Sequence, residues 1–464
     1  MRSSFLTIIA IAFVALLAPS IATAEDFNQA LASAYLHNPK LKAERARVRE
    51  TDENYVQAQA AGRFTVNANG SIGRTRSETV SFAFIGGASS HDFNGTPRSG
   101  QLSIVQPLYQ GGRVQGLKAQ ARAGVLAARQ GLRNTEQNIL LSAATAYSDV
   151  IRDEEAAIIR RNNVRVLVRH LEAARDKFNV GEGTLTDIAQ AKARLAQAEA
   201  GLANADAQLA ISRASYVRFV GHIPEQLQKP PQFVLPKTVI DAQAQARRNN
   251  PQMLATRYNE YVAQAAIHVA KAAGRPTLSL SGTIQGSRDT SSNILLSESA
   301  TISAQVRVPI YQGGFNQSRV RAAKHARIRS KFETRETELV IDQAVANLWA
   351  QVDAATRTVT ASKKQIDAAE IAYEGVQLEQ EVGTRNTLDV LNAEQELLDA
   401  KLAVVQAERN LRVAEYQLIV TMGGFDSYSL QLPVQIYDPK DNFDAVSVNP
   451  IYKYVSDTLE KIAD

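Results

Sequence analysis

Apolar and polar residues alternate in two separate parts of the chain, between about residues 64 and 110 and between about residues 276 and 310. The apolar positions of the outgoing segments are Phe64, Val66, Ala68 and Ile72 in the first part and Leu278, Leu280 and Ile284 in the second. Such alternation is typical of β-strands with one apolar face. We therefore predict one β-hairpin in each part, and four strands of about ten residues, long enough to cross a bilayer when tilted.

A polar segment rich in Gly and Ser precedes each returning strand. The apolar positions of the returning strands are Leu102, Ile104 and Leu108 in the first part and Ile302, Ala304, Val306, Val308 and Ile310 in the second. Proline donates no hydrogen bond to a neighbouring strand, so we expect Pro107 and Pro309 to end these strands.

The long stretches after the strands have helical character. No proline occurs from Leu108 to Ile223 or from Ile310 to Leu432. Residues 113–178 alone would form roughly 100 Å of helix at ~1.5 Å per residue. Apolar residues recur every seven positions, and many alanines flank them; these positions are Leu195, Leu202, Leu209, Val390, Leu397, Val404 and Leu411. The pattern predicts coiled-coil packing in two helical hairpins, at about 113–222 and 315–422.

Each helical hairpin is interrupted once, near residues 180–187 and 382–389. Gly181 and Gly383 allow the positive φ that stops a helix within one turn. In the first break Thr184 or Thr186 is placed to cap the returning helix, and in the second Asn386 or Thr387. We therefore predict that these breaks are the tips of the hairpins.

Four short motifs occur twice. Residues 37–39 and 60–63 recur 212 positions later, for example Pro39 at Pro251. The motif from Pro107 to Gly112 and the pair Val180-Gly181 recur 202 positions later. The chain is therefore predicted to be a tandem duplication, with the first repeat at 25–235, the second at 236–425 and a C-terminal tail at 426–464.

The N-terminus predicts export. Arg2 precedes an apolar run that ends at Pro19, and Ala22 and Ala24 supply the small residues of a cut before Glu25. These features are typical of a signal peptide over residues 1–24. The chain contains no cysteine, which excludes a disulfide framework and a lipid-bearing cysteine after the cut.

Candidate chemistry is sparse. The formal net charge is +5, but Lys and Arg alternate with Glu and Asp along the helices, so we expect no nucleic-acid partner. The six histidines are scattered without metal-ligand spacing, and no nucleophile or phosphate-loop motif occurs. We therefore predict neither an enzyme nor a cofactor or metal site.

Four strands cannot close a membrane barrel, since the smallest closed barrels have eight and an open edge in lipid leaves backbone groups unpaired. The chain is therefore predicted to share a barrel with copies of itself. Two copies would give eight strands, and three would give twelve with a lumen too wide for side chains to fill.

Several of these motifs resemble the TolC-type outer-membrane efflux proteins. They are the Tyr-Gln-Gly-Gly segments at 109–112 and 311–314, the VGxxxxTD pattern at 180–187, and the segments 382–385 and 388–391. The resemblance covers essentially all of residues 25–425. It implies an α+β membrane protein that is a homotrimer, with a twelve-stranded β-barrel in the outer membrane and an α-helical tunnel through the periplasm. It also implies an exit duct that receives small molecules or secreted protein from an inner-membrane pump or ABC transporter through a periplasmic adaptor.

The resemblance assigns roles at the tips. Arg385 would bridge to Asp187 on the neighbouring hairpin, beside Thr186, and Asp389 would form an acidic ring in the pore. Gln380 and Asn392 occupy positions where the best-known member has a tyrosine of the closing network and a second ring aspartate. The adaptor would dock on Val180, Gly181 and Thr184 of the first tip and on Val382, Gly383 and Thr384 of the second.

The sequence also allows other interpretations of the tip residues and of the class of protein. Arg385 and Asp389 are four residues apart at the start of a helix, so they also fit an ordinary solvated pair. A periplasmic adaptor would also have long helical hairpins, but would carry one of them between lipoyl-like β segments. A structural coiled coil without a pore would need no alternating strands.

Overall fold

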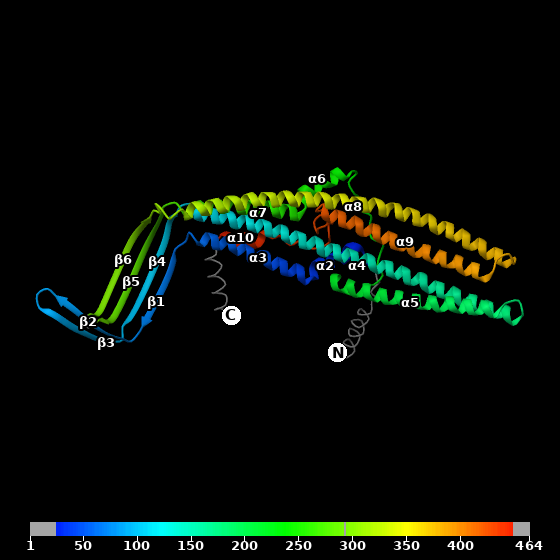
Figure 1. Cartoon of the computed structure of the whole chain (residues 1–464), viewed down its shortest axis with the longest axis horizontal. Helices are drawn as coiled ribbons and strands as arrows, with labels where there is room; N and C mark the ends of the chain where they lie inside the picture. The colour runs from blue at the N-terminus through cyan, green and yellow to red at the C-terminus, as the bar shows by residue number, and fades with distance from the viewer. Residues whose placement is uncertain (1–24, 292–293, 449–464) are drawn as a thin grey trace, which may run out of the picture. The chain divides into compact units, whose positions relative to one another are not determined.

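Helices of matching length occur twice along the chain (Figure 1). The computed structural model describes residues 25–291 and 294–448. The predicted signal peptide lies outside the described residues. So does the segment 454–462 of the C-terminal tail, where the sequence indicates a short helix. Each repeat begins with a helix of 11 residues and one of 22, namely α2 (Phe27–His37) and α3 (Pro39–Ala60), then α6 (Val239–Asn249) and α7 (Pro251–Ala272).

The long helices repeat in the same way. Helix α4 (Arg113–Asn179) and helix α8 (Phe315–Glu381) have 67 residues each. The helices that return from the tips are α5 (Leu185–Val220), with 36 residues, and α9 (Thr387–Thr421), with 35. Long helices are thus present in both repeats, and they are interrupted between Asn179 and Leu185 and between Glu381 and Thr387.

One antiparallel sheet of four strands is built from both repeats. Its order is β1-β4-β5-β6, where the strands are β1 (Thr65–Ile72), β4 (Arg98–Gln110), β5 (Thr277–Ser291) and β6 (Ile294–Arg307) (Figure 1). Strands β1 and β6 form the two edges, and each pairs on one side only within the described residues.

The register places apolar residues on one face of this sheet. Val66 pairs with Ile104, Leu102 with Ile284, and Gly282 with Ile302, so these rows share a face. The opposite face carries polar pairs, and Ser71–Ser99 and Ser281–Ser303 also form side-chain hydrogen bonds of 2.8 and 2.9 Å. The apolar face is open in the single chain: Ile302 is 83% exposed and Ile284 is 62% exposed. The predicted alternation is confirmed, but its apolar side is covered by no part of the described chain.

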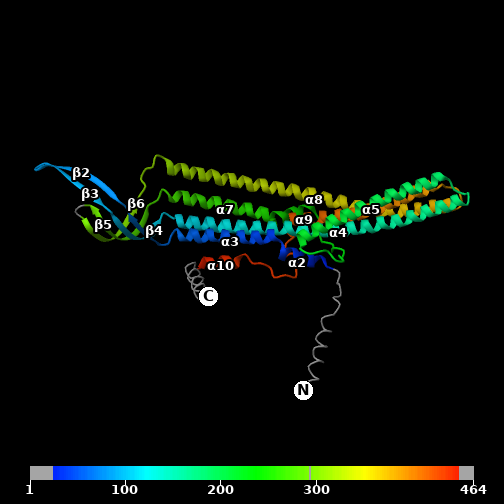
Figure 2. The ribbon, with the colours of Figure 1, turned by 90° about the horizontal axis from the view of Figure 1, so that it is seen from below.

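The first β segment differs from the prediction in two ways. The stretch between its outgoing and returning strands, expected as a polar loop, forms a second hairpin of β2 (Thr75–Ala83) and β3 (Gly87–Gly95) (Figure 2). The described chain therefore has six strands, not four, although four of them form the main sheet. Pro107 does not end the returning strand: β4 continues to Gln110 through a bulge between Pro107 and Tyr109, which removes the need for a donor at the proline.

Contacts divide the chain into two units, and each takes segments from both repeats. One unit comprises the described residues of 1–44, 133–251 and 339–437. Its core is aromatic, with Phe27 packed on Tyr147 and Tyr416 at ring distances of 5.3 and 5.6 Å. The buried hydroxyl of Tyr147 donates to the carbonyl of Gln228 at 2.7 Å and lies 3.0 Å from the carbonyl oxygen of Glu25. This unit carries both hairpin tips.

The other unit comprises the described residues of 45–132, 252–338 and 438–464, including the sheet. The C-terminal helix α10 (Lys440–Val448) packs here, since Asn442 donates to Asp52 at 2.9 Å and Phe443 lies 5.0 Å from the ring of Tyr55. In neither unit does a described helix carry an apolar stretch long enough to cross a membrane.

Candidate functional site

The first hairpin tip closes on Gly181. Its φ is +83°, and the amide of Glu182 donates to the carbonyl of Lys177 at 2.8 Å, the bond that ends a helix at a left-handed residue. Thr184 caps α5, and its hydroxyl accepts from the amide of Asp187 at 3.2 Å. In return the Asp187 carboxylate accepts from the Thr184 amide at 3.0 Å and hydroxyl at 2.7 Å. Of the two predicted caps, Thr184 is the one used.

These hydrogen bonds lower the pKa of Asp187, because they stabilise the charged carboxylate. The Asp187 side chain is therefore held in its own capping box and is anionic at neutral pH.

The second tip repeats this backbone closely. Gly383 has a φ of +82°, and the amide of Thr384 donates to the carbonyl of Glu379 at 2.9 Å. Asn386 caps α9, its side-chain oxygen accepts from the amide of Asp389 at 2.9 Å, and Asp389 accepts from the Asn386 amide at 3.2 Å. Asp389 thus takes the place that Asp187 has in the first tip.

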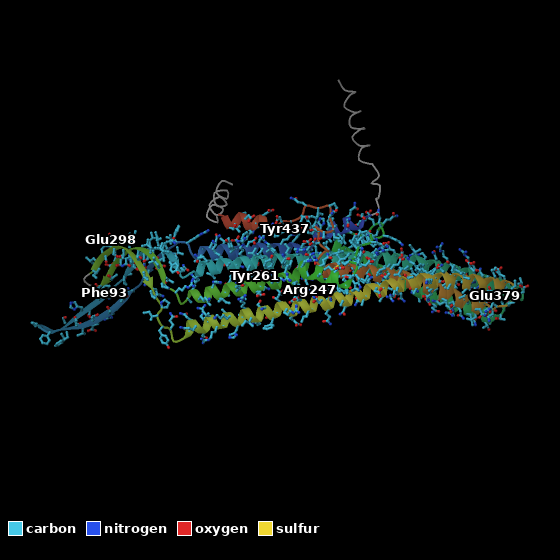
Figure 3. All side chains as sticks on the ribbon, turned by 90° about the horizontal axis from the view of Figure 1, so that it is seen from above. Phe93, Arg247, Tyr261, Glu298, Glu379 and Tyr437 are labelled. Carbon is cyan, nitrogen blue, oxygen red and sulfur yellow. The ribbon has the colours of Figure 1, made fainter. Side chains whose placement is uncertain are left out.

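Arg385 has a partner in its own tip. Its Nε donates to Oε2 of Glu379 at 2.9 Å, and both side chains are about half exposed. Glu379 lies at the end of the second hairpin (Figure 3). The predicted bridge from Arg385 to Asp187 therefore stays a prediction: in the single chain Arg385 is held by Glu379 and Asp187 by Thr184.

The remaining candidate gate residues lie in the helical turns next to the tips: Gln380 in the last turn of α8, and Thr186 and Asn392 near the starts of α5 and α9. Gln380 donates to the hydroxyl of Thr387 at 3.3 Å, a contact inside the second hairpin. Thr186 lies in the first turn of α5. Asn392 instead contacts the other hairpin, since its Oδ1 accepts from Arg194 on α5 at 2.7 Å. Val180 and Val382 are 72% and 76% exposed, so the tips present apolar side chains to solvent.

Two residues at the junction of the hairpins escaped the sequence analysis. Arg194 is one of many charged residues on α5, and nothing in its spacing marks it. Glu394 is buried on α9, and its Oε2 lies 3.4 Å from Nε2 of His170 on α4. The sequence signal for Glu394 is its place four residues after Val390 and three before Leu397, the spacing of core positions within a heptad, where a carboxylate faces a coiled-coil core.

Within the described residues, no three His, Asp or Glu side chains lie close enough together to hold a metal ion. The chemistry of the tips is therefore that of charged and hydrogen-bonding contacts between helices.

Comparison with known proteins identifies many similar chains. The sequence model of the family described as Outer membrane efflux protein matches residues 30–222 and 243–424. The outer membrane efflux protein BepC of Brucella suis is 33% identical over 432 residues, which cover 92% of this chain and 91% of BepC. The outer membrane protein TolC of Escherichia coli is 22% identical over 428 residues, covering 89% of this chain and 85% of TolC.

Solved structures have the same fold. A CusC structure matches with a TM-score of 0.72 and 18% identity, covering 86% of this chain and 92% of CusC. The open-state structure of the MtrE outer membrane channel from Neisseria gonorrhoeae matches with a TM-score of 0.70 and 20% identity, covering 88% and 91%.

Proposed function

The chain belongs to the outer membrane efflux protein family, and from this premise we propose that it forms an exit duct in the outer membrane. The duct would carry small molecules, or secreted protein, from a periplasmic adaptor and an inner-membrane pump or ABC transporter to the outside. The observation that carries this proposal is the four-stranded sheet, with an exposed apolar face, a polar face and two open edges.

Elementary energetics favour assembly of this sheet with copies of itself. In lipid, an unpaired backbone amide or carbonyl costs several kcal/mol, so the edges β1 and β6 need partners. Pairing of β6 with β1 of the next copy would satisfy both edges. Three copies would give a twelve-stranded barrel, whose apolar face meets lipid and whose polar face lines water. We therefore propose a homotrimer.

The helical tips would form the periplasmic entrance of the duct. They present the exposed residues Val180 and Val382 for an adaptor to contact, beside the glycines that turn the chain. We propose that adaptors dock on these turns, at Gly181, Thr184, Gly383 and Thr384. Asp389 would face the pore, and Arg385 would help hold the entrance closed.

The two rival interpretations are less well supported. A periplasmic adaptor or a poreless coiled coil would not need a sheet with one apolar face, and neither belongs to the matched family. Opening of the entrance would be a shift between two arrangements of the hairpins and involves no chemistry.

The first test of the duct is a single-channel recording of the purified protein in a planar bilayer, with its oligomer mass measured in the same preparation. A trimer with a small, steady conductance is expected. Arg385→Ala should enlarge the resting conductance, because it frees Glu379 and removes a cation from the entrance. Arg357→Ala is the matched control, since Arg357 is an exposed arginine of α8, the helix that leads to this tip, and pairs with Asp353 at 3.0 Å. An unchanged conductance in Arg385→Ala would remove Arg385 from the gate.

A second test addresses the ring of Asp389. Asp389→Asn keeps an acceptor for the Asn386 amide but removes the charge, so the preference for cations should fall. The measurement is the reversal potential under a salt gradient, with Asp353→Asn as control. Identical reversal potentials in the wild type and in Asp389→Asn would place Asp389 outside the pore.

A further inference from the structure

The two helical hairpins are joined by polar contacts a few turns behind their tips. Arg194 on α5 donates to Oδ1 of Asn392 on α9 at 2.7 Å. One half-turn further along α9, Glu394 lies 3.4 Å from His170 on α4. Both contacts connect the hairpin of α4 and α5 with the hairpin of α8 and α9, so separating the hairpins here would break both.

Glu394 is an unusual residue for such a place. Its side chain is 9% exposed, and Oε2 is buried without a hydrogen bond within the described residues. The repeat-related position in the first hairpin is Lys192, which is exposed. A buried carboxylate without hydrogen bonds to its charged oxygen costs free energy when it is ionised. One proton shared with His170 leaves the pair without net charge and removes that cost.

We propose that Arg194–Asn392 and His170–Glu394 form a latch between the hairpins, in which His170 and Glu394 share one proton while the entrance is closed. The latch loosens when that proton leaves. The inference rests on the proposed duct, because the latch acts on the entrance of that duct.

The electrostatics of the surroundings agree with one shared proton. Burial raises the pKa of Glu394 to about 7 and lowers the pKa of His170. Burial, and then the charge of Glu394, raise the pKa of Tyr373 on α8. A net charge on the pair is therefore unfavourable. The pair would carry a net charge if Glu394 were an anion beside a neutral His170, or if His170 were protonated beside a neutral carboxyl.

Two other charged groups of the neighbouring helices are already engaged. On α9, Lys401 pairs with Glu370 of α8 at 3.3 Å, and on α5 Arg194 is held by Asn392. A cavity of about 220 Å³ lies beside Glu394, and its lining includes Tyr373, Lys401, Asn162 and Asn163. The cavity is large enough for several waters, and the polar groups in its lining could bind them beside the buried pair, which gives that pair a route for proton exchange.

The sign of the pH effect follows from these shifts. The closed latch binds the proton of Glu394 more tightly than a hydrated, opened one, so closure is favoured as pH falls from about 7 toward the ordinary carboxyl range. As pH rises above about 7 the proton leaves, and the closed form loses its advantage. Below the lowered pKa of His170 a second proton enters, and closure weakens again. One site changes the ratio of closed to open forms by at most about tenfold per pH unit.

The test is the open probability of reconstituted channels between pH 6 and pH 8.5. Wild type should open more at pH 8.5, whereas Glu394→Gln, which keeps size and loses the titration, should stay closed and show little pH dependence. Asp389→Asn is the control for the exposed acidic ring and should keep the wild-type pH dependence. An unchanged pH dependence in Glu394→Gln would overturn the inference.

The other half of the latch needs a different readout. Arg194→Ala should raise the open probability at every pH and leave the pH dependence in place, and Arg194→Lys should restore closure because it keeps one donor for Asn392. A loss of pH dependence in Arg194→Ala, or no change in opening, would contradict the assigned roles.

A measurement that needs no pore separates this inference from the proposed function. The thermal midpoint of Glu394→Gln minus that of wild type should rise as pH increases from 6 to 8.5. If that rise is seen but no pore forms, the result supports the shared proton and contradicts the proposed duct. If a pore forms but the difference in thermal midpoint does not change with pH, the result supports the duct and contradicts the shared proton.

Discussion

The two hairpin tips have nearly the same backbone but different side chains and surroundings. Gly181 and Gly383 have φ values of +83° and +82°, and each is followed by a capping box that ends on an aspartate. At the positions of Glu379 and Arg385 the first tip has Lys177 and Gly183, so only the second tip carries this ion pair.

The helices that return from the tips differ more strongly. Helix α9 has thirteen buried residues, whereas α5 has four. Val413 on α9 is 8% exposed, and the repeat-related Ile211 on α5 is 59% exposed. The two repeats have therefore kept the same turn conformation although their returning helices have different surroundings. Helix α9 is packed inside the chain, whereas α5 exposes apolar side chains to solvent in the single chain.

The largest expected contrast comes from the same substitution at these repeat-related positions. Val413→Asp places an unpaired charge in a packed helix interface and should destabilise the fold by about 4 kcal/mol or more. Ile211→Asp should leave the helix content and thermal midpoint of the chain close to wild type, but weaken assembly if α5 contacts a neighbouring copy. Circular dichroism and the mass of the detergent-solubilised protein measure both. Comparable unfolding in the two variants would contradict the difference in burial between α9 and α5.

A smaller effect is expected at the tip glycines. Alanine at a positive φ costs about 1–2 kcal/mol, so Gly181→Ala and Gly383→Ala should each speed amide exchange at their own tip by about 5–30-fold. Gly375→Ala is the control, because Gly375 lies inside α8 with open space around it and an alanine there favours the helix. An effect at only one tip would show that the shared backbone is not equally important in both.

The helix caps should give a slightly smaller effect. Thr184→Ala and Asn386→Ala each remove the acceptor for an aspartate amide, at a cost of about 1 kcal/mol. Hydrogen exchange in the first turns of α5 and α9 should therefore rise about fivefold, and Thr186→Ala, which leaves the cap intact, should not change it. If Thr186→Ala matches Thr184→Ala, the cap assignment is wrong.

The smallest effect on stability is expected at the ion pair that only the second tip has. Arg385 and Glu379 are exposed, and exposed pairs contribute little to stability. Arg385→Ala should leave hydrogen exchange at the tip unchanged even though it alters the channel conductance. Faster exchange at the tip would mean that Arg385 holds the turn itself together.

The sequence by itself determined the local elements. Alternation at Val66, Leu280 and Ile302 gave the strands, proline-free runs gave the long helices, and Gly181 and Gly383 gave the breaks, because these properties depend on near neighbours in the chain. The choice of Thr184 over Thr186, and of Asn386 over Thr387, was left open because both alternatives satisfy the same local rule.

The tertiary structure alone decided what lies far apart in the sequence. The contact of Arg194 with Asn392 joins residues 198 positions apart, and the burial of Glu394 depends on helices from both repeats. The β2–β3 hairpin was not predicted because its strands are mostly polar and show no regular apolar alternation, so pairing rather than burial defines them. Local patterns fix which elements form, whereas burial and partners are set by packing between distant segments, which no short stretch of sequence encodes.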